Sequence, residues 1–412
     1  MSYDVDKIRQ QFPMLNSGKK MQGHPLVYLD NCSTTFKPKC VIDAISSYYT
    51  DSTANSHRGD YDLLYQMDVE VLNTRKAVAR FVNCDVNEVI FTSGTTMSLN
   101  QIAFGYGLKK LRKGDEIILS EEEHASNVLP WFNVAKSTGA VIKYVPLTKE
   151  GDITEDNLRK VISRKTKVVS LVHVGNVLGN INDVKMMARV AHEFGAIIAI
   201  DGAQSVPHLK TDFKAWDIDF LSFSAHKMCG PTGIGCLIGK ASLLKEMEPL
   251  ISGGGNNVDF HMDGTVEYLD PPAKFEAGTL NLSGILGFKK AIEFIESIGV
   301  ENIHQHDREL IEYALEKLDK CDDIIIYNKY AKNGILTFNR KVVFAQDEAT
   351  LLNSKGIAVR SGQHCAKILD QYLNCKATVR MSTYLYTNKN DIDVFVDALI
   401  EGGDILDAYF TN

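Results

Sequence analysis

The sequence predicts an α/β protein that has a mostly parallel seven-stranded sheet in a large domain and a smaller α+β domain. The first observation is that short apolar segments alternate with helical patterns between about residues 89 and 239. The second is a change of pattern after about Gly287, where long helices are followed by short strands. The third is the length of 412 residues with 44% hydrophobic content, which suffices for a large core and two domains.

Seven segments have the length and apolar composition of strands buried in a sheet. They are residues 89–92, 116–119, 141–145, 167–174, 196–200, 220–223 and 235–238. Between the fourth and fifth of them, apolar residues recur at the period of a helix face, namely Val184, Met187, Ala188 and Ala191. Asn182 or Asp183 suits the N-cap of this helix and Gly195 its end, so the segment predicts a βαβ unit.

The domain boundaries follow from the change of pattern. We expect residues 26–287 to form the large domain, and residues 1–25 together with 288–412 to form the small one. The small domain should contain helices at 288–298, 302–318 and 391–400 and strands near 324–327 and 334–339. The amphipathic start of the chain, with Val5, Ile8 and Phe12 on one side, should pack against it.

Composition excludes several classes of function. The net charge is −7 with both signs interspersed, which disfavours nucleic acid and anionic lipid as partners. No segment approaches the roughly 18 to 20 apolar residues of a membrane span, and residues 1–11 do not resemble a signal peptide. We therefore expect a cytoplasmic protein without membrane contact. Its eight cysteines form no Cys-x-x-Cys pair, so reduced thiols are expected and no metal site.

Asp201 and Lys227 carry the strongest chemical signal. Asp201 closes one apolar strand, and Lys227 follows the next strand 26 positions later (227 − 201) in the sequence Ser-Ala-His-Lys. An aspartate at this place can pair with the pyridine nitrogen of pyridoxal phosphate, while the lysine amine can join the aldehyde carbon of the same cofactor. The pair therefore predicts a pyridoxal phosphate site.

Polar residues follow the other predicted strands as well. Backbone N–H groups and hydroxyls of residues 92–96 can hold a phosphate where a strand runs into a helix, although Gly-Thr-Thr alone equally suits a capped turn. His124 can stack on an aromatic cofactor or move a proton, although a lone loop histidine is often structural. Asn176, Gln204, Ser224 and His226 also stand at strand ends, where open α/β sheets bind ligands.

These residues belong to a series of motifs that resembles the class V, fold-type I pyridoxal phosphate enzymes and, among them, the SUF-type (group II) cysteine desulfurases. The motifs span about residues 26–380 in order. They are Tyr28-Leu29-Asp30-Asn31, Asn55-Ser56-His57-Arg58-Gly59, Ser93-Gly94-Thr95-Thr96, Asp201-Gly202-Ala203-Gln204-Ser205, Ser224-Ala225-His226-Lys227, Phe275-Glu276-Ala277-Gly278-Thr279 and Arg360-Ser361-Gly362-Gln363-His364-Cys365-Ala366.

The resemblance implies a role for each matching residue. Lys227 would carry the cofactor, Asp201 would face the pyridine nitrogen, Gln204 the phenolate oxygen and His124 the ring. The phosphate would be held by Thr95, Thr96, Ser224 and His226, with Asn176 also at the cofactor. Enzymes of this family act as homodimers in which the residue matching Thr279 reaches the partner's phosphate, so a homodimer is expected.

Cys365 is the expected second nucleophile. It lies in a polar loop close in sequence to two cationic candidates, Arg360 and His364, and cationic neighbours lower the pKa of a thiol from about 8.5. The resemblance implies that its thiolate takes the sulfur of L-cysteine as a persulfide. The substrate carboxylate would be bound by Arg380 with Asn176, with Arg360 as the second cation and His57 as a further substrate contact.

The chain departs from the family pattern at a few positions. The usual Asp-Asn-Ala-Ala reads Asp30-Asn31-Cys32-Ser33, so a thiol and a hydroxyl are expected in the pocket. Gln363, Lys367 and Gly175 replace residues more typical of the family. Phe344 stands where enzymes that serve zinc-containing acceptors often carry a histidine, so we expect no exchange of a zinc ligand there.

The sequence thus predicts a cysteine desulfurase that makes L-alanine and passes the sulfur of its persulfide to a small SUF-type acceptor for iron-sulfur cluster assembly. L-Selenocysteine remains an alternative substrate, since a selenocysteine lyase would share nearly all of these residues. Another class V aminotransferase, lyase or epimerase is a further alternative, and would not depend on the Cys365 thiol. A catalytically silent scaffold is disfavoured because Asp201, Lys227, Cys365 and Arg380 are all present.

Overall fold

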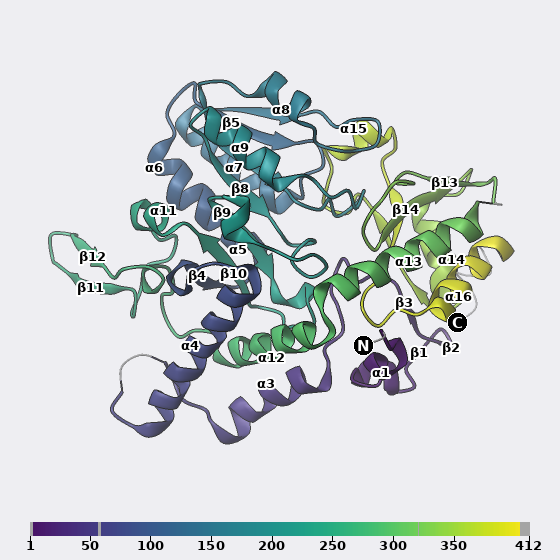
Figure 1. Ribbon diagram of the computed structural model, residues 1–412, viewed down its shortest axis with the longest axis horizontal. Helices are drawn as coiled ribbons and strands as arrows, with labels where there is room; N and C mark the ends of the chain where they lie inside the picture. Colours follow the sequence, from purple (N-terminus) through teal and green to yellow (C-terminus); the bar gives the residue numbers. More distant parts are fainter. Residues whose placement is uncertain (1–2, 57–58, 320, 404–412) are drawn as a thin grey trace.

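Figure 1 shows the computed structural model of the chain, which describes residues 3–56, 59–319 and 321–403. Its centre is a seven-stranded sheet in the order β4-β10-β9-β8-β7-β5-β6, in which β10 alone runs antiparallel to its neighbours. The strands are β4 (Val89–Thr92), β5 (Glu116–Ser120), β6 (Val141–Val145), β7 (Thr166–Val172), β8 (Ile197–Asp201), β9 (Phe220–Ser224) and β10 (Gly235–Gly239). All seven predicted strands are confirmed.

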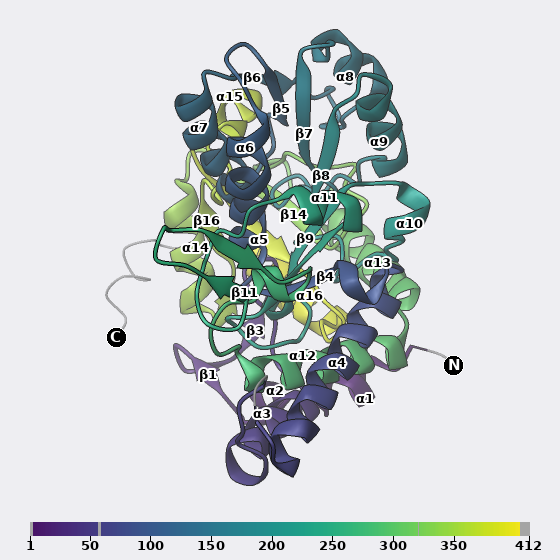
Figure 2. The ribbon, with the colours of Figure 1, turned by 90° about the vertical axis from the view of Figure 1, so that its left-hand side faces the viewer.

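Both faces of this sheet are covered by helices, as Figures 1 and 2 show. Side chains of a strand alternate between the faces: Val89 and Phe91 of β4 join one apolar cluster, and Ile90 joins the other. The first face is covered by α3 (Lys39–Asp51), α4 (Asp62–Val82), α8 (Glu155–Val161), α9 (Val184–Glu193), α10 (Phe213–Trp216) and α12 (Leu282–Ile298). The second is covered by α5 (Thr95–Ile102), α7 (Ala125–Thr138) and α11 (Ala241–Glu246), and α6 (Leu108–Lys110) lies against α7.

The predicted βαβ unit is confirmed in detail. Helix α9 is capped by Asp183, whose side chain accepts a hydrogen bond from the Met186 amide, and the buried residues of the helix include the four predicted apolar positions. Gly195 follows the helix with a φ of +76°, a conformation that glycine adopts without strain.

A second, antiparallel sheet lies beside the first, at the right of Figure 1. Its order is β13 (Ile324–Ile326), β14 (Ile335–Arg340), β17 (Thr378–Ser382) and β16 (Arg360–Gly362). It shares an apolar core with α13 (Val300–Leu318), α14 (Ala345–Ser354) and α16 (Lys389–Glu401). The strands and helices that the sequence predicts for this region are therefore confirmed.

The junction between the two parts is a continuous helix. Helix α12 begins at Leu282, six residues before the predicted start at 288 (288 − 282), and its apolar side from Leu282 to Ile295 packs in the core of the large sheet. The domain division at residue 287 stays a prediction, and the chain remains helical across it.

The amino-terminal segment contacts residues near the other end of the chain. It contains α1 (Val5–Arg9) and α2 (Pro13–Asn16). Arg9 Nη1 lies 2.7 Å from both the Asp391 Oδ2 atom and the carbonyl oxygen of Tyr386. Phe12 is fully buried and packs edge-on against Phe294 and Tyr386.

A short strand pairing brings the segment after residue 28 between the two sheets. Strand β3 (Val27–Tyr28) pairs in parallel with β15 (Ile357–Ala358), and Asp30 forms a bridge to Ser382 at the end of β17. The remaining strands and α-helix of the described residues are β1 (Lys20–Met21), β2 (His24–Pro25), the hairpin of β11 (Asn257–Phe260) and β12 (Val266–Tyr268), and α15 (Leu369–Leu373). None of the helices in the described part of the chain has the length and apolar content needed to cross a bilayer.

Arg75 and Glu276 form a buried ion pair that ties α4 to the sheet. The two guanidinium nitrogens lie 2.8 and 2.7 Å from the two carboxylate oxygens, and Oε1 also accepts a hydrogen bond of 2.7 Å from the Phe91 amide. The guanidinium lies over the Phe91 ring. Both side chains are almost inaccessible to solvent, so the loss of one partner would leave a buried charge without compensation.

We expect Glu276→Gln to lower the free energy of unfolding by about 3–5 kcal/mol, because it leaves the Arg75 charge buried and unpaired. The matched control is Glu296→Gln, which removes a pair with Arg80 at the surface and should change that free energy by at most about 1 kcal/mol. Urea unfolding followed by circular dichroism gives both values. Equal changes in the free energy of unfolding for Glu276→Gln and Glu296→Gln would contradict the view that the buried pair stabilises the fold more than the surface pair.

Candidate active site

The carboxyl ends of the parallel strands open into a cavity of about 210 Å³, closed on its other side by residues of the smaller sheet and its loops. Twelve of the predicted site residues line it. They are Thr95, Thr96, His124, Asn176, Asp201, Gln204, Ser224, His226, Lys227, Arg360, Cys365 and Arg380. Residues from seven segments of the chain are thus brought to one place by the topology.

Two predicted residues do not line the cavity. The Thr279 hydroxyl lies 3.5 Å from the Asn55 side-chain amide on an exposed segment, so its expected contact with a partner subunit stays a prediction. His57 lies outside the described residues. Cys32 and Ser33 line the cavity, as expected from the departure from the family pattern, and His364 lines it beside Cys365. Ser126 also lines it, although the sequence assigned it no role.

Asp201 and Lys227 face the same cavity from neighbouring strands. Asp201 ends β8 and is buried, with Oδ1 accepting a hydrogen bond of 2.9 Å from the Ala203 amide, and burial raises the pKa of its carboxyl group. Lys227 ends the short turn after β9, where burial lowers the pKa of its amine and the Asp201 charge opposes this effect. A lowered amine pKa favours the neutral, nucleophilic form.

Hydroxyl groups gather at one end of the cavity, where α5 begins. The Ser224 oxygen accepts a hydrogen bond of 2.8 Å from the Thr95 amide and lies 2.7 Å from the Thr95 hydroxyl, and the Thr96 hydroxyl lies 2.8 Å from that of Ser126. Gly94 has a φ of +143°, and a Cβ there would lie 3.1 Å from the Ser224 oxygen. A glycine is therefore required for this close approach.

Two imidazoles at the cavity are neutral. Burial lowers the pKa of His124 to about 4, and that of His226 likewise to about 4, with Lys227 contributing in both cases. His124 caps α7: its Nδ1 atom accepts a hydrogen bond of 3.1 Å from the Ser126 amide, which assigns its proton to Nε2. His226 Nδ1 lies 3.3 Å from the Thr34 hydroxyl.

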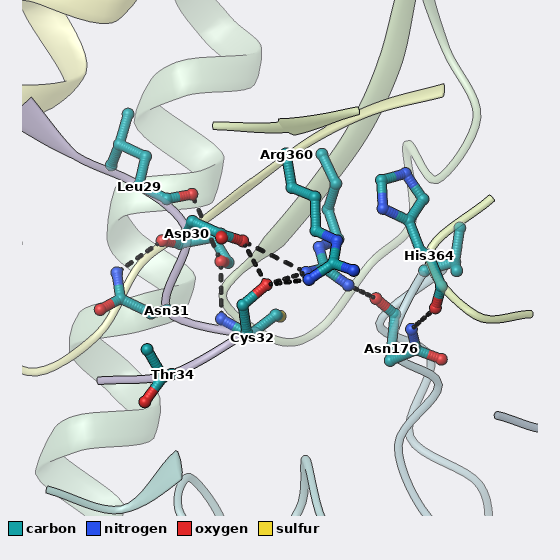
Figure 3. A network of polar contacts seen from close by, with 12 residues as sticks. Leu29, Asp30, Asn31, Cys32, Thr34, Asn176, Arg360 and His364 are labelled. Atoms are coloured by element: carbon teal, nitrogen blue, oxygen red, sulfur yellow. Dashed lines mark hydrogen bonds and ion pairs between the residues drawn. The ribbon is translucent and has the colours of Figure 1, made fainter. Parts of the chain in front are cut away.

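Arg380 is the buried cation of the site. Its Nη1 atom donates a hydrogen bond of 2.8 Å to the carbonyl oxygen of Asn176, and its Nη2 atom lies 3.3 Å from Asp30 Oδ1. Figure 3 shows Asp30, Asn176 and Arg360 in the same network. Arg380 Nε and Asn176 Oδ1 are buried and have no hydrogen-bond partner among the described residues, which leaves a donor and an acceptor for a ligand.

The Cys365 thiol is presented by an unusual turn of the backbone. His364 and Cys365 both have left-handed φ values, +50° and +59°, which are unfavourable for residues other than glycine. Two hydrogen bonds hold the turn: the Asn176 side-chain amide donates to the His364 carbonyl over 2.8 Å, and the Ala125 amide donates to the Cys365 carbonyl over 2.7 Å. Cys365 itself is exposed at the mouth of the cavity.

The expectation that His364 is a cation beside the thiol is wrong. Its imidazole is buried, with Nε2 lying 2.9 Å from the Thr378 hydroxyl, and burial together with the nearby Arg380 charge lowers its pKa to about 3. His364 is therefore neutral at ordinary pH. Arg360 remains the cationic residue of this loop that lines the cavity.

With this geometry established, the comparisons place the chain in a family. Residues 27–395 match the model of the aminotransferase class-V family, so the chain belongs to that family. A probable cysteine desulfurase of Halalkalibacterium halodurans is 44% identical, over 99% of both chains, and one of Staphylococcus epidermidis is 43% identical, over 97% of this chain and 96% of the other. The crystal structure of the cysteine desulfurase CsdA from Escherichia coli has a TM-score of 0.90 and 33% identity over 97% of this chain and 98% of the other.

The fold is accordingly that of the fold-type I pyridoxal phosphate enzymes, and the cavity fits this cofactor. A buried carboxylate and a lysine amine face each other across it, and the hydroxyls at the start of α5 offer donors to a phosphate. The two guanidinium groups that line the cavity, those of Arg360 and Arg380, outnumber the one carboxylate among the lining residues, which suits an anionic cofactor and substrate.

Behind the cavity wall, Glu122 explains one departure from the family pattern. Glu122 is buried, with Oε1 accepting a hydrogen bond of 2.8 Å from the Asn182 side chain. Its Oε2 atom occupies the space next to Gly175, where an added Cβ would lie only 2.1 Å away. Burial raises the pKa of Glu122 to about 8, with Glu123 and Asp152 adding to the effect, so the group is a neutral acid at pH 7. Glycine at 175 therefore makes room for a carboxyl group.

We expect Gly175→Ser to destabilise the protein by about 1–3 kcal/mol, because the new side chain overlaps Glu122. Adding Glu122→Ala to this variant should recover most of the loss, which denaturant unfolding would measure. Gly254→Ser is the matched control, since an added Cβ there meets nothing within 4 Å. A full loss that persists in the double variant would contradict the steric explanation.

We expect Glu122→Gln to change how stability depends on pH. Between about pH 4.5 and 8 the unfolded chain loses the Glu122 proton while the folded chain keeps it, so the wild type loses stability as the pH rises through this range. The glutamine variant lacks this loss, and its Tm should exceed that of the wild type by several degrees at about pH 8 but far less at about pH 5. Thermal unfolding of wild type and Glu122→Gln in matched buffers measures this difference in Tm, and Glu150→Gln, at an exposed glutamate, is the control. A difference in Tm that is the same at both pH values would contradict the raised pKa of Glu122.

Proposed function

We propose that this protein is a pyridoxal phosphate-dependent cysteine desulfurase, which converts L-cysteine to L-alanine and retains the sulfur as a persulfide on Cys365. One observation carries the proposal: the Cys365 thiol faces the same cavity as the Lys227 amine and the Asp201 carboxylate. An aminotransferase needs the last two but has no use for the thiol. The probable cysteine desulfurases that match the whole chain support the same activity.

The roles of the residues follow from their chemistry. Pyridoxal phosphate, when bound, withdraws electrons from the α-carbon of an amino acid and so weakens bonds at and beyond that carbon. Lys227 would hold the cofactor through its amine and, once that amine is free, would accept the α-proton. Asp201 would pair with the ring nitrogen, because a buried carboxylate needs an opposite charge as compensation. His124 would stack on the ring, and Gln204 would bind the phenolate oxygen.

Residues of the smaller sheet and its loops bind the substrate and take up its sulfur. Arg380, assisted by Asn176, binds the α-carboxylate, and Arg360 supplies a second positive charge beside it. The Cys365 thiolate attacks the substrate sulfur; the carbon–sulfur bond breaks, its electrons stay with the three-carbon fragment that becomes alanine, and the sulfur remains on Cys365.

The assembly is part of the same proposal. We propose a homodimer in which Thr279 reaches the phosphate bound by the partner subunit, a cytoplasmic location, and a small SUF-type protein as acceptor of the sulfur for iron-sulfur cluster assembly. Large apolar side chains stand exposed on α4 and the β11–β12 hairpin, as expected for a surface that a second protomer covers. They include Leu63, Tyr65, Leu72, Phe260, Met262 and Val266.

We expect Cys365→Ala to lose the persulfide and at least about 100-fold of the rate of alanine formation, because no nucleophile remains to accept the sulfur. Mass spectrometry of the intact wild-type protein after incubation with L-cysteine should show an adduct of about 32 Da, one sulfur atom, that the variant lacks. Cys375→Ala, which removes a thiol outside the cavity, should retain both the adduct and the rate. Lys227→Ala should abolish both. Alanine formation at the full rate in Cys365→Ala would refute the proposal, and a requirement for a keto acid would indicate an aminotransferase.

A further inference from the structure

Arg360 and Arg380 lie directly opposite each other in the antiparallel pair of β16 and β17. Residues at opposite positions of such a pair carry their side chains on the same face of the sheet, about 5 Å apart at their Cβ atoms, and like charges there destabilise the pairing. Both side chains also line the cavity, where charges are less screened than in bulk water. The two guanidinium groups therefore need a hydrogen-bond acceptor between them, or a negative charge beside them, to stay side by side.

The Ser33 hydroxyl occupies that position. Its oxygen accepts a hydrogen bond of 2.9 Å from Arg360 Nη1 and one of 3.2 Å from Arg380 Nη2, and it donates its proton to Asp30 Oδ1 over 2.7 Å. One donor and two lone pairs are all that a hydroxyl offers, so each of them is used. The Asp30 carboxylate adds the negative charge that offsets the two cations, and the network is drawn in Figure 3.

The loop that carries Ser33 is itself fixed to the end of β17. The Asn31 side-chain amide donates to the Ser382 carbonyl over 2.7 Å, and the Cys32 amide donates to the Ser382 hydroxyl over 2.9 Å. Tyr386 donates a further hydrogen bond to Asn31. The Ser33 hydroxyl is therefore held by the same strand that carries Arg380.

The two arginines depend on this hydroxyl to different degrees. Arg380 is buried and keeps the Asn176 carbonyl and Asp30 as partners without it. Arg360 is exposed, and the Ser33 oxygen is the one hydrogen-bond partner of its side chain among the described residues. Removal of the hydroxyl would thus free the Arg360 side chain and leave Arg380 in place.

We propose that Ser33 is a positioning residue: it holds the Arg360 guanidinium beside that of Arg380, so that a substrate carboxylate meets two fixed cations. This inference rests on the proposed function, in which the substrate is an α-amino acid. Alanine lacks the hydroxyl and is smaller than serine, so Ser33→Ala removes the three hydrogen bonds without adding bulk to the cavity wall.

The first test compares Ser33→Ala and Ser33→Thr with wild type. We expect Ser33→Ala to raise the KM for L-cysteine about 5- to 20-fold, the effect of losing one charge-assisted hydrogen bond, with kcat changed less than about twofold. Ser33→Thr keeps the hydroxyl and should stay close to wild type. Unchanged KM in Ser33→Ala, or an equal loss in Ser33→Thr, would overturn the inference.

The second test measures binding without turnover. L-Alanine and ethylamine differ by the carboxylate alone. Calorimetric titration of the cofactor-loaded protein with each of them therefore separates binding of the carboxylate from binding of the amine and the carbon chain. Ser33→Ala should raise the Kd of L-alanine about 5- to 20-fold and leave that of ethylamine within about twofold. Equal weakening of both ligands would show a general disturbance of the site and would overturn the inference.

The third test asks whether Ser33 acts through Arg360. In an Arg360→Ala background, adding Ser33→Ala should raise the Kd of L-alanine by less than about twofold, because the residue that Ser33 positions is gone. A full additional effect would overturn the inference. If the wild type formed no alanine from L-cysteine, the proposed function would fail, while the alanine and ethylamine titrations would still decide the role of Ser33.

Discussion

The site depends on the buried guanidinium of Arg380, which joins three segments that are far apart in the sequence. It extends from β17 of the smaller sheet to the Asn176 carbonyl beyond β7 of the large sheet, and to Asp30 in the loop after β3. A charge removed from water is tolerated only when it is compensated by hydrogen bonds or an opposite charge. Arg380 therefore ties the two sheets together at the cavity, where Asn328 and Thr337 add hydrogen bonds to the Leu178 and Val177 carbonyls.

The charges in the cavity depend on the burial of its side chains between the two sheets. Burial keeps three imidazoles neutral, those of His124, His226 and His364, with pKa values lowered to about 4, 4 and 3. They can donate or accept hydrogen bonds or stack, but they add no charge. The positive charge of the cavity then comes from the guanidinium groups of Arg360 and Arg380. These two groups favour anionic ligands.

Much of this could be predicted from the sequence, because buried parallel strands appear as apolar runs and their carboxyl ends meet at one edge of a sheet. That rule alone groups Asp201, Ser224 and Lys227. Other features depend on contacts between distant segments. The start of α12 at Leu282 was missed because glycines at 284 and 287 weaken the helical pattern, yet a Cβ at Gly287 would lie 2.8 Å from Ile45 of α3. The opposition of Arg360 and Arg380 depends on the register of two strands, which no local pattern encodes.

The position of Cys365 depends on contacts from both parts of the protein. Its loop leaves β16, the strand paired with the one that carries Arg380. The left-handed turn of this loop is held by Asn176, in the loop after β7, and by Ala125, the first residue of α7, both from segments that follow strands of the large sheet. Two consecutive left-handed residues are unfavourable by about 1–2 kcal/mol each, so the turn persists only while these external donors hold it. Because His364 is neutral, the Cys365 thiol has no ion pair with this imidazole, and its position depends on the backbone of the loop. A thiol held from both sides, yet exposed, is open both to the cavity and to the solvent outside it.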